Sequence, residues 1–157
     1  LRREAATRGV DPARLVFAPR LPAAEHLARH RLADLFLDTL PVNAHTTASD
    51  ALWAGVPVVT CTGEAFAGRV AASLLRAAGL ADLVTDSLAA YEAVALDLAR
   101  DPVRLAGVRE RLAAGRTTCA LFDTARSCRH LEAAYATMWE RHLRGEPPAA
   151  FAVAAID

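Results

Sequence analysis

Residues 33–55 read ADLFLDTLPVNAHTTASDALWAG, and this stretch decides the fold that the sequence predicts. It contains a short apolar run, Leu35–Leu37, which ends at Asp38 and is followed by Pro41. Apolar runs of this length with polar or proline ends are typical of buried strands in parallel sheets, because both faces of such strands are covered. We therefore predict a buried strand here, with a loop directly after it.

A helix is predicted directly after that loop. Thr47 and Asp50 have the spacing of a capping box, in which the threonine hydroxyl accepts a hydrogen bond from a backbone N–H and the carboxylate reaches back to the cap. The helix should therefore begin near Thr46 or Thr47. Gly55 and Pro57 should end it after about two turns, because glycine favours the position after a helix and proline cannot continue one.

The start of this helix is a candidate anion-binding site. A helix N-terminus presents free backbone N–H groups and the positive end of the helix dipole, and here it follows the carboxyl end of a strand. His45 stands beside these amides and can add a further hydrogen-bond donor. The spacing alone fits a plain helix cap with a loop histidine equally well, so both interpretations stay open at this point.

Strands and helices alternate along the rest of the first half of the chain. The patterns predict a strand at Leu15–Ala18, a helix from about Ala23 to Ala33 that leads into Leu35–Leu37 as the central strand, a strand at Val56–Cys61, a helix from Phe66 to Ala78, and a last short strand at Leu83–Val84. Such alternation is typical of right-handed crossovers. The predicted fold class is α/β, with a Rossmann-like parallel sheet flanked by helices.

The second half of the chain is predicted to be a helical extension. Helix starts are indicated by Ser87, by Asp101 with Pro102, and by Asp123 or Thr124. The last of these helices should run to about Leu143, with Met138 and Trp139 packed in the core. Residues 145–148 (GEPP) should break it and leave a short apolar tail that ends at Asp157.

Composition argues against several classes of protein. The formal net charge is zero and aromatic residues make up 6%, so the basic surface that nucleic-acid binding needs is missing. Cys61, Cys119 and Cys128 are widely spaced and match neither a disulfide framework nor a zinc site, which fits a reducing cytoplasm. No apolar run approaches the roughly 20 residues of a membrane span. We therefore expect a cytoplasmic protein with no nucleic-acid or membrane partner.

The length of 157 residues suits one domain. The chain begins at Leu1 in what looks like the end of a helix, and it has fewer strands than a complete nucleotide-binding domain needs. We therefore expect residues 1–157 to form a single domain that is a fragment of a longer chain. No internal repeat is evident at periods of 20 to 50 residues.

A series of short motifs resembles the donor-binding region of the O-linked N-acetylglucosamine transferases. The likeness runs from about Arg14 to His142 with matching order and spacing, which makes it highly specific. The motifs are Leu37-Asp38-Thr39, Asn43-Ala44-His45-Thr46-Thr47, Asp50, Leu52-Trp53-Ala54-Gly55, Pro57-Val58-Val59-Thr60, Gly63-Glu64, Arg69-Val70-Ala71-Ala72-Ser73 and Met138-Trp139-Glu140.

The resemblance implies the C-terminal half of a two-domain GT-B glycosyltransferase, with UDP across the carboxyl ends of the strands. Negative charge grows on the β-phosphate as the sugar leaves, and hydrogen-bond donors already aimed at it stabilise the transition state. The backbone amides and hydroxyls of Thr46 and Thr47, with His45, are the expected catalytic groups. The sequence lacks an Asp-x-Asp motif and the helix end supplies positive charge, so neither a metal nor another cofactor is expected.

The resemblance also implies further contacts with the nucleotide. Asp50 would hold the ribose, His26 would stack on uracil, and the backbone at Leu21 would contact the edge of the base. Arg29 lies one turn along from His26, where the family also has an arginine, although a solvated helix charge accounts for it equally well. Arg69 is a weaker candidate, because the helix dipole disfavours a positive charge at a helix start and an anionic group would explain it.

The chain departs from the family in what it lacks. Animal members carry a lysine shortly before the matched histidine, where this chain has Ala23, so one ribose contact is in doubt. The glutamine and lysine that the family uses near the pyrophosphate, and the candidates for the catalytic base, would lie upstream of Leu1 in the N-terminal catalytic lobe. We therefore expect this chain alone to be inactive.

The expected function is transfer of N-acetylglucosamine from UDP-GlcNAc to serine or threonine hydroxyls of acceptor proteins, with inversion at the anomeric carbon. A neighbouring branch of the family transfers fucose and has a Gly-Thr-Thr-Thr type of loop, so His45-Thr46-Thr47 favours the UDP sugar. The expected partners in the same polypeptide are the N-terminal lobe and tetratricopeptide (TPR) repeats. Two alternatives stay open: a related GT-B transferase with another donor or acceptor, and a non-catalytic nucleotide-binding module of a repeat-protein scaffold.

Overall fold

Three short parallel strands form the sheet of the computed structural model, which describes residues 1–156. The strands are β1 (Phe36–Leu37), β2 (Val58–Cys61) and β3 (Val84–Thr85), and they lie in the order β1-β2-β3. Phe36 pairs with Val58, and Thr60 pairs with Val84, both in parallel register. The predicted strand at Leu35–Leu37 forms β1, but its predicted place was wrong: it lies at an edge of this sheet, and β2 is the central strand. It is also not buried as predicted, because an edge strand lacks a neighbour on one side: Phe36 is half-buried and Leu37 is 54% exposed.

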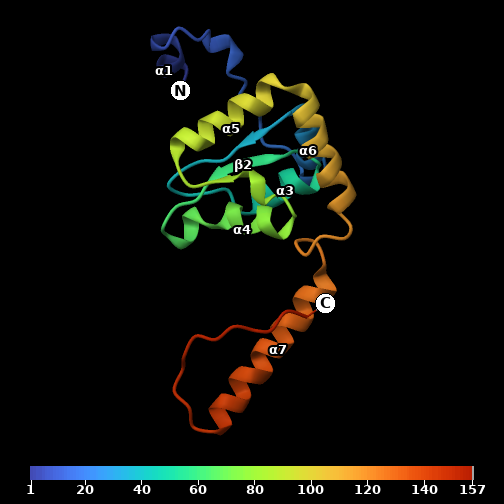
Figure 1. The fold of residues 1–157 in the computed structure, drawn as a ribbon. Coiled ribbons are helices and arrows are strands. Elements are labelled where there is room, and N and C mark those ends of the chain that lie inside the picture. The colour runs from blue at the N-terminus through green and yellow to red at the C-terminus, as the bar shows by residue number, and fades with distance from the viewer. Residues whose placement is uncertain (157) are drawn as a thin grey trace.

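In the described residues, seven α-helices surround or extend this sheet (Figure 1). They are α1 (Arg2–Thr7), α2 (Ala23–Arg29), α3 (Thr46–Trp53), α4 (Val70–Ala77), α5 (Leu88–Arg100), α6 (Pro102–Gly115) and α7 (Thr124–Leu143). In Figure 1 the sheet lies between α5 on one side and α4 on the other. This layering confirms the predicted α/β class: α3 and α4 connect the parallel strands, and α5, which follows β3, packs on β2 from the other side.

The core lies where these layers meet β2. All four residues of β2 are buried, as a strand covered on both faces requires. Leucines from the flanking helices complete the core, and each is at most 1% exposed: Leu52 of α3, Leu75 of α4, Leu98 of α5 and Leu112 of α6. The apolar stripes that indicated these helices therefore face the sheet, which is where the hydrophobic effect places them.

The helix boundaries follow the local signals in the sequence. Ser87 accepts from Ala90 N at the start of α5, and Asp101 accepts from Val103 N and Arg104 N at the start of α6. Asp123 rather than Thr124 caps α7, through a hydrogen bond from Arg126 N of 2.8 Å. Gly55 follows the end of α3 with a φ of +88°, a conformation that glycine adopts without strain.

The predicted strand at Leu15–Ala18 is wrong. These residues follow a short 3₁₀ turn, η1 (Pro12–Arg14), and belong to no sheet in the part of the chain that the structure describes. Val16 is 87% exposed and Phe17 is 57% exposed. A strand needs a neighbour to pair its backbone groups, and the three strands of residues 1–156 leave this segment without one. The β-propensity of these residues alone was therefore insufficient to predict a strand.

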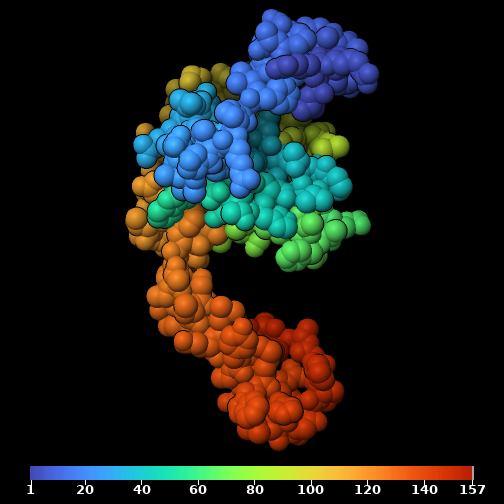
Figure 2. Space-filling model, turned by 180° about the vertical axis from the view of Figure 1, so that it is seen from behind, coloured from blue at the N-terminus to red at the C-terminus, as the bar shows by residue number. Residues whose placement is uncertain are grey.

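The predicted core position of Met138 and Trp139 is also wrong. Helix α7 projects away from the α/β body and the tail returns along it (Figures 1 and 2). Met138 is 46% exposed and Trp139 is 61% exposed, and α7 contains no buried residue. The apolar face of α7 is real, but it packs partly against the tail and not against the core of the α/β body. The last residue of the predicted tail, Asp157, lies outside the described residues.

Truncation of a core leucine tests this packing. We expect Leu75→Ala to lower the free energy of unfolding by about 2–5 kcal/mol, because the fully buried side chain leaves a cavity beside β2. Leu88→Ala is the matched control: Leu88 is 67% exposed at the start of α5, so the change should stay within about 0.5 kcal/mol. Urea denaturation measures both, and equal losses would contradict the assigned core.

Candidate functional site

The loop from β1 to α3 folds around one buried carboxylate. Asp38 is 6% exposed and lies at the carboxyl end of β1. Its Oδ1 accepts from Thr39 N at 2.8 Å and from Ala44 N at 2.7 Å, and its Oδ2 accepts from the Thr60 hydroxyl at 2.6 Å. The carboxylate therefore joins both ends of the loop to the central strand, immediately before the start of α3.

The start of α3 is not capped as the sequence suggested. The helix begins at Thr46 with His45 as its N-cap, and no side chain of the described residues caps it. Thr47 therefore lies inside the first turn, and the expected capping box with Asp50 is wrong. The first backbone N–H groups of α3 stay free of a side-chain acceptor, which leaves them available to an anion at the positive end of the helix.

The predicted site residues of α3 lie together around these amides. His45, Thr46 and Thr47 are exposed, and Asp50 is half-buried one turn further along. The His45 ring lies edge-on to the Phe66 ring, with 6.3 Å between centroids, and its Nε2 lies 3.5 Å from the Ala67 carbonyl oxygen. A second loop therefore borders His45, and it includes the 3₁₀ turn η3 (Phe66–Gly68).

That second loop packs closely on the first. Gly63 N donates to Gly68 O at 2.6 Å, and Asn43 N donates to Ala67 O at 2.8 Å. A Cβ on Gly68 would lie 3.0 Å from the Pro41 carbonyl oxygen and 3.1 Å from Gly63 Cα. Glycine at position 68 therefore lets the two loops meet, backbone against backbone, beside His45.

The three other predicted nucleotide contacts form a separate group on and before α2. Leu21, His26 and Arg29 line one open pocket of about 550 Å³. Arg29 Nη2 lies 2.7 Å from His26 Nδ1, and Arg29 Nη1 donates to the Pro19 carbonyl oxygen. A guanidinium nitrogen can only donate, so Nδ1 of His26 accepts and its Nε2 carries the proton. Arg29 is half-buried in this arrangement, which argues against a solvated helix charge.

Arg69 precedes α4 and is exposed. It lines an apolar pocket of about 340 Å³ with Phe66, Val70, Ser73 and Leu74. Phe66 also contacts His45, so this pocket adjoins the α3 group. The arginine is thus placed near the candidate anion site, although no interaction joins it to His45.

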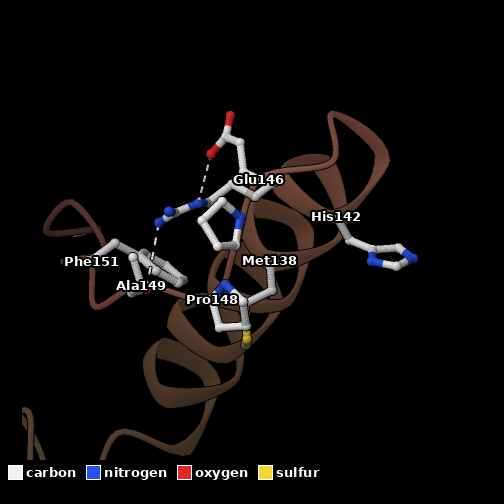
Figure 3. A pocket seen from close by; sticks show the side chains of 8 residues that line it. Met138, His142, Glu146, Pro148, Ala149 and Phe151 are labelled. Atoms are coloured by element: carbon white, nitrogen blue, oxygen red, sulfur yellow. Dashed lines mark hydrogen bonds and ion pairs between the residues drawn. The ribbon is translucent and has the colours of Figure 1, made fainter.

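A further pocket lies between α7 and the tail, far along the chain from the predicted site (Figure 3). Its volume is about 290 Å³, and its walls include Met138, Pro148 and Phe151. An ion pair of 2.9 Å between Arg141 and Glu146 holds the tail against the helix. His142 points away from these residues in Figure 3. This pocket contains none of the predicted nucleotide contacts.

Asp38, Thr60 and Tyr91 support the site but were missed as such by the sequence analysis. Tyr91 of α5 donates its hydroxyl to the Asp38 carbonyl oxygen at 2.8 Å. Burial raises the pKa of the Tyr91 phenol, and the Asp38 carboxylate and Cys61 raise that pKa further. One signal was present in the sequence, because Asp38 directly follows a predicted strand. The parallel register that brings Thr60 of β2 beside it is seen only in the structure.

The close contact at Gly68 gives one prediction. We expect Gly68→Ala to lower the free energy of unfolding by about 1–3 kcal/mol, because the new Cβ meets two backbone atoms that cannot move freely. Gly107→Ala in α6 is the control, since its Cβ would meet nothing within 4 Å. That change should stabilise by about 0.5–1 kcal/mol. Thermal denaturation compares them, and a harmless Gly68→Ala would contradict the loop contact.

Tyr91 gives a prediction about alkaline pH. Its raised folded-state pKa means that the phenol stabilises the fold fully below about pH 10, and that this stability is lost as pH rises through the raised value. Tyr91→Phe should cost about 1 kcal/mol at neutral pH and should flatten the alkaline loss. The chain has no lysine, so few other groups titrate there.

Urea denaturation of both proteins between neutral and alkaline pH measures this effect. Tyr135→Phe serves as the control, because it removes an exposed phenol on α7. An unchanged alkaline loss in Tyr91→Phe would show that another group is responsible.

Comparison with known proteins places this site in a family. The sequence model of glycosyl transferase family 41 matches residues 1–131. The probable UDP-N-acetylglucosamine–peptide N-acetylglucosaminyltransferase SEC of Arabidopsis thaliana is 43% identical over 150 residues, which cover 95% of this chain and 15% of that protein. The UDP-N-acetylglucosamine–peptide N-acetylglucosaminyltransferase of Caenorhabditis elegans is 40% identical over 147 residues, covering 94% and 13%.

A solved structure agrees with these relatives. A mutant of the Thermobaculum terrenum O-GlcNAc transferase superposes with a TM-score of 0.87 at 40% identity, over 92% of this chain and 28% of that one. The chain thus spans only 13–15% of the two curated relatives, and its α/β sheet corresponds to part of a GT-B catalytic region. The family expected from the motifs is confirmed: the chain belongs to glycosyl transferase family 41.

Proposed function

We propose that this chain is the nucleotide-sugar-binding half of an inverting glycosyltransferase, which moves N-acetylglucosamine from UDP-GlcNAc to serine or threonine hydroxyls of proteins. The observation that carries the proposal is the uncapped start of α3 at the carboxyl end of β1, bordered by His45. The chain belongs to a family whose relatives are named as UDP-N-acetylglucosamine–peptide N-acetylglucosaminyltransferases.

The free amides supply the chemistry that the departure of UDP needs. Negative charge grows on the β-phosphate as its bond to the anomeric carbon breaks. In this proposal the N–H groups and hydroxyls of Thr46 and Thr47, with His45, donate hydrogen bonds to that phosphate. Their positions are set before the reaction by α3 and its loop, so they stabilise the developing charge without reorganising. The positive end of α3 supports the same charge, and we propose that no metal ion or other cofactor is needed.

The pocket on α2 is assigned to the uracil ring. His26 offers a flat face for stacking, and the bonds from Arg29 to His26 and to Pro19 hold the imidazole and the preceding turn together. The backbone at Leu21 lines the same pocket and is proposed to contact the base edge. Asp50 is assigned to the ribose, and this assignment is chemically consistent because its carboxylate is not engaged in the capping box.

Other parts of the reaction are assigned outside this chain. The relatives are much longer, and we propose that an N-terminal lobe supplies the catalytic base and the remaining pyrophosphate contacts. TPR repeats in the same polypeptide and a cytoplasmic location belong to the same proposal. Within residues 1–156, every helix falls short of the length and apolarity that crossing a membrane requires. This chain alone should bind nucleotide without turning over.

Calorimetric titration with UDP, GDP and uridine tests the proposal. We expect saturable binding of UDP but not of GDP, and a loss of about tenfold or more in UDP affinity for His45→Ala and Asp50→Ala. His142→Ala is the matched control, because it removes an exposed histidine from α7. EDTA should leave UDP binding unchanged.

The native-length protein resolves the remaining outcomes. Binding of UDP by that protein but not by this chain would mean that residues outside the chain are indispensable to the site. Failure of both folded proteins to bind UDP would contradict the proposal and favour a non-catalytic module. A preference for GDP would indicate a related transferase with another sugar donor.

A further inference from the structure

Asp38 has no role in the function proposed above, yet its carboxylate accepts three hydrogen bonds, from Thr39, Ala44 and Thr60. We propose that Asp38 is a positioning residue of the diphosphate site: its buried carboxylate, held by Thr60, fixes the loop that aims His45 and the first amides of α3. This inference rests on the proposed function, because it deepens the account of the same site.

The carboxylate is directed into the protein and not toward the nucleotide. Asp38 is 6% exposed, and both of its side-chain oxygens are occupied by donors from the chain itself. A buried carboxylate without such partners would be strongly disfavoured, whereas hydrogen bonds to a charged acceptor are stronger than neutral ones. The three donors also offset a negative charge that would otherwise repel a nearby phosphate. Asp38 therefore acts through the loop rather than on the substrate.

The bond to Ala44 is the step that links the carboxylate to the site. Ala44 directly precedes His45, and its N–H donates to Asp38 Oδ1 at 2.7 Å. That bond restrains the Asn43–Ala44 peptide, one peptide unit before the N–H of His45, and the His45 side chain makes no capping hydrogen bond. Without this bond the Asn43–Ala44 peptide can rotate, and in our proposal the N–H groups of Thr46 and Thr47 then change direction. Small changes in aim are costly at sites that rely on preorganised donors.

The anchor for this carboxylate comes from the middle of the sheet. Thr60 of β2 is fully buried, and its hydroxyl donates to Asp38 Oδ2 at 2.6 Å. The Thr85 hydroxyl of β3 donates to the Thr60 carbonyl oxygen at 2.9 Å, a bond that joins the two strands and does not reach the Asp38 carboxylate. Tyr91 of α5 holds the Asp38 carbonyl oxygen. The loop is thus attached to the buried central strand, and a catalytic group is positioned best by regular elements of this kind.

The two buried threonines provide a matched pair of variants. Thr60→Val and Thr85→Val each remove one buried hydroxyl with little change in shape, but only Thr60 contacts the Asp38 carboxylate. Asp38→Ala removes all three acceptor contacts. Asp38→Asn is the rescue variant, because its amide oxygen can still accept from Thr39 N and Ala44 N while its nitrogen donates to the Thr60 hydroxyl.

The measurement is the affinity of the native-length protein for UDP and for uridine, and the ratio of the two dissociation constants reports on the diphosphate alone. We expect Thr60→Val and Asp38→Ala to lower the preference for UDP by about tenfold or more, with uridine affinity within about twofold of the wild type. Thr85→Val should keep the wild-type ratio, and Asp38→Asn should stay within about threefold of it. A purely structural role would not separate the two ligands.

The outcomes separate this inference from the function on which it rests. If the wild-type protein shows no preference for UDP over uridine, the proposed function fails and this inference falls with it. If the wild type prefers UDP and folded Thr60→Val keeps that preference, the positioning role is overturned while the proposed function stands. If Thr60→Val and Thr85→Val lower the affinities for UDP and uridine equally, the hydrogen bonds of these two threonines are merely structural and the inference is also overturned. Should Asp38→Ala fail to fold, Thr60→Val decides.

Discussion

The parallel pairing of β2 with β1 and β3 is the constraint on which the rest of the structure depends. Parallel strands need a crossover between them, which α3 and α4 supply, and α5 covers the central strand from the opposite side. All four residues of β2 are consequently buried, and the carboxyl ends of the strands meet at one edge. Three segments leave the sheet at this edge: the loop before α3, the loop after β2 that contains Gly63 and Gly68, and the segment after β3. The site follows from the topology before any particular side chain is considered.

The diphosphate site that we propose lies at this edge, in a chain with no net charge. The formal net charge of the chain is zero, and besides the exposed Arg69 the donors that border this site are local dipoles. The free amides of α3 and the side chain of His45 are such groups. Backbone N–H donors depend on direction more than a point charge does. The orientation of these donors is therefore important, and in our proposal the hydrogen bonds of the buried Asp38 help to fix it.

Helix α7 shows the limits of amphipathic patterns. Its apolar residues repeat at helical spacing, and the helix forms, with Asp123 as its cap. Even so, Met138 and Trp139 remain exposed, because the helix points away from the sheet. Periodicity reports which face of a helix is apolar. It does not report what that face packs against, or whether the partner lies within the same stretch of chain.

The sequence by itself determined the elements that depend on neighbouring residues: the strand, loop and helix of residues 35–55, the caps at Ser87 and Asp101, and the family. Only the tertiary structure decided that Leu15–Ala18 is not a strand, since pairing needs a partner. It also replaced the expected Thr47–Asp50 box by an uncapped helix start. Asp38 meets Thr60 and Tyr91 across 22 and 53 positions of sequence. Contacts at such separations arise from packing of the whole chain, which no local spacing encodes.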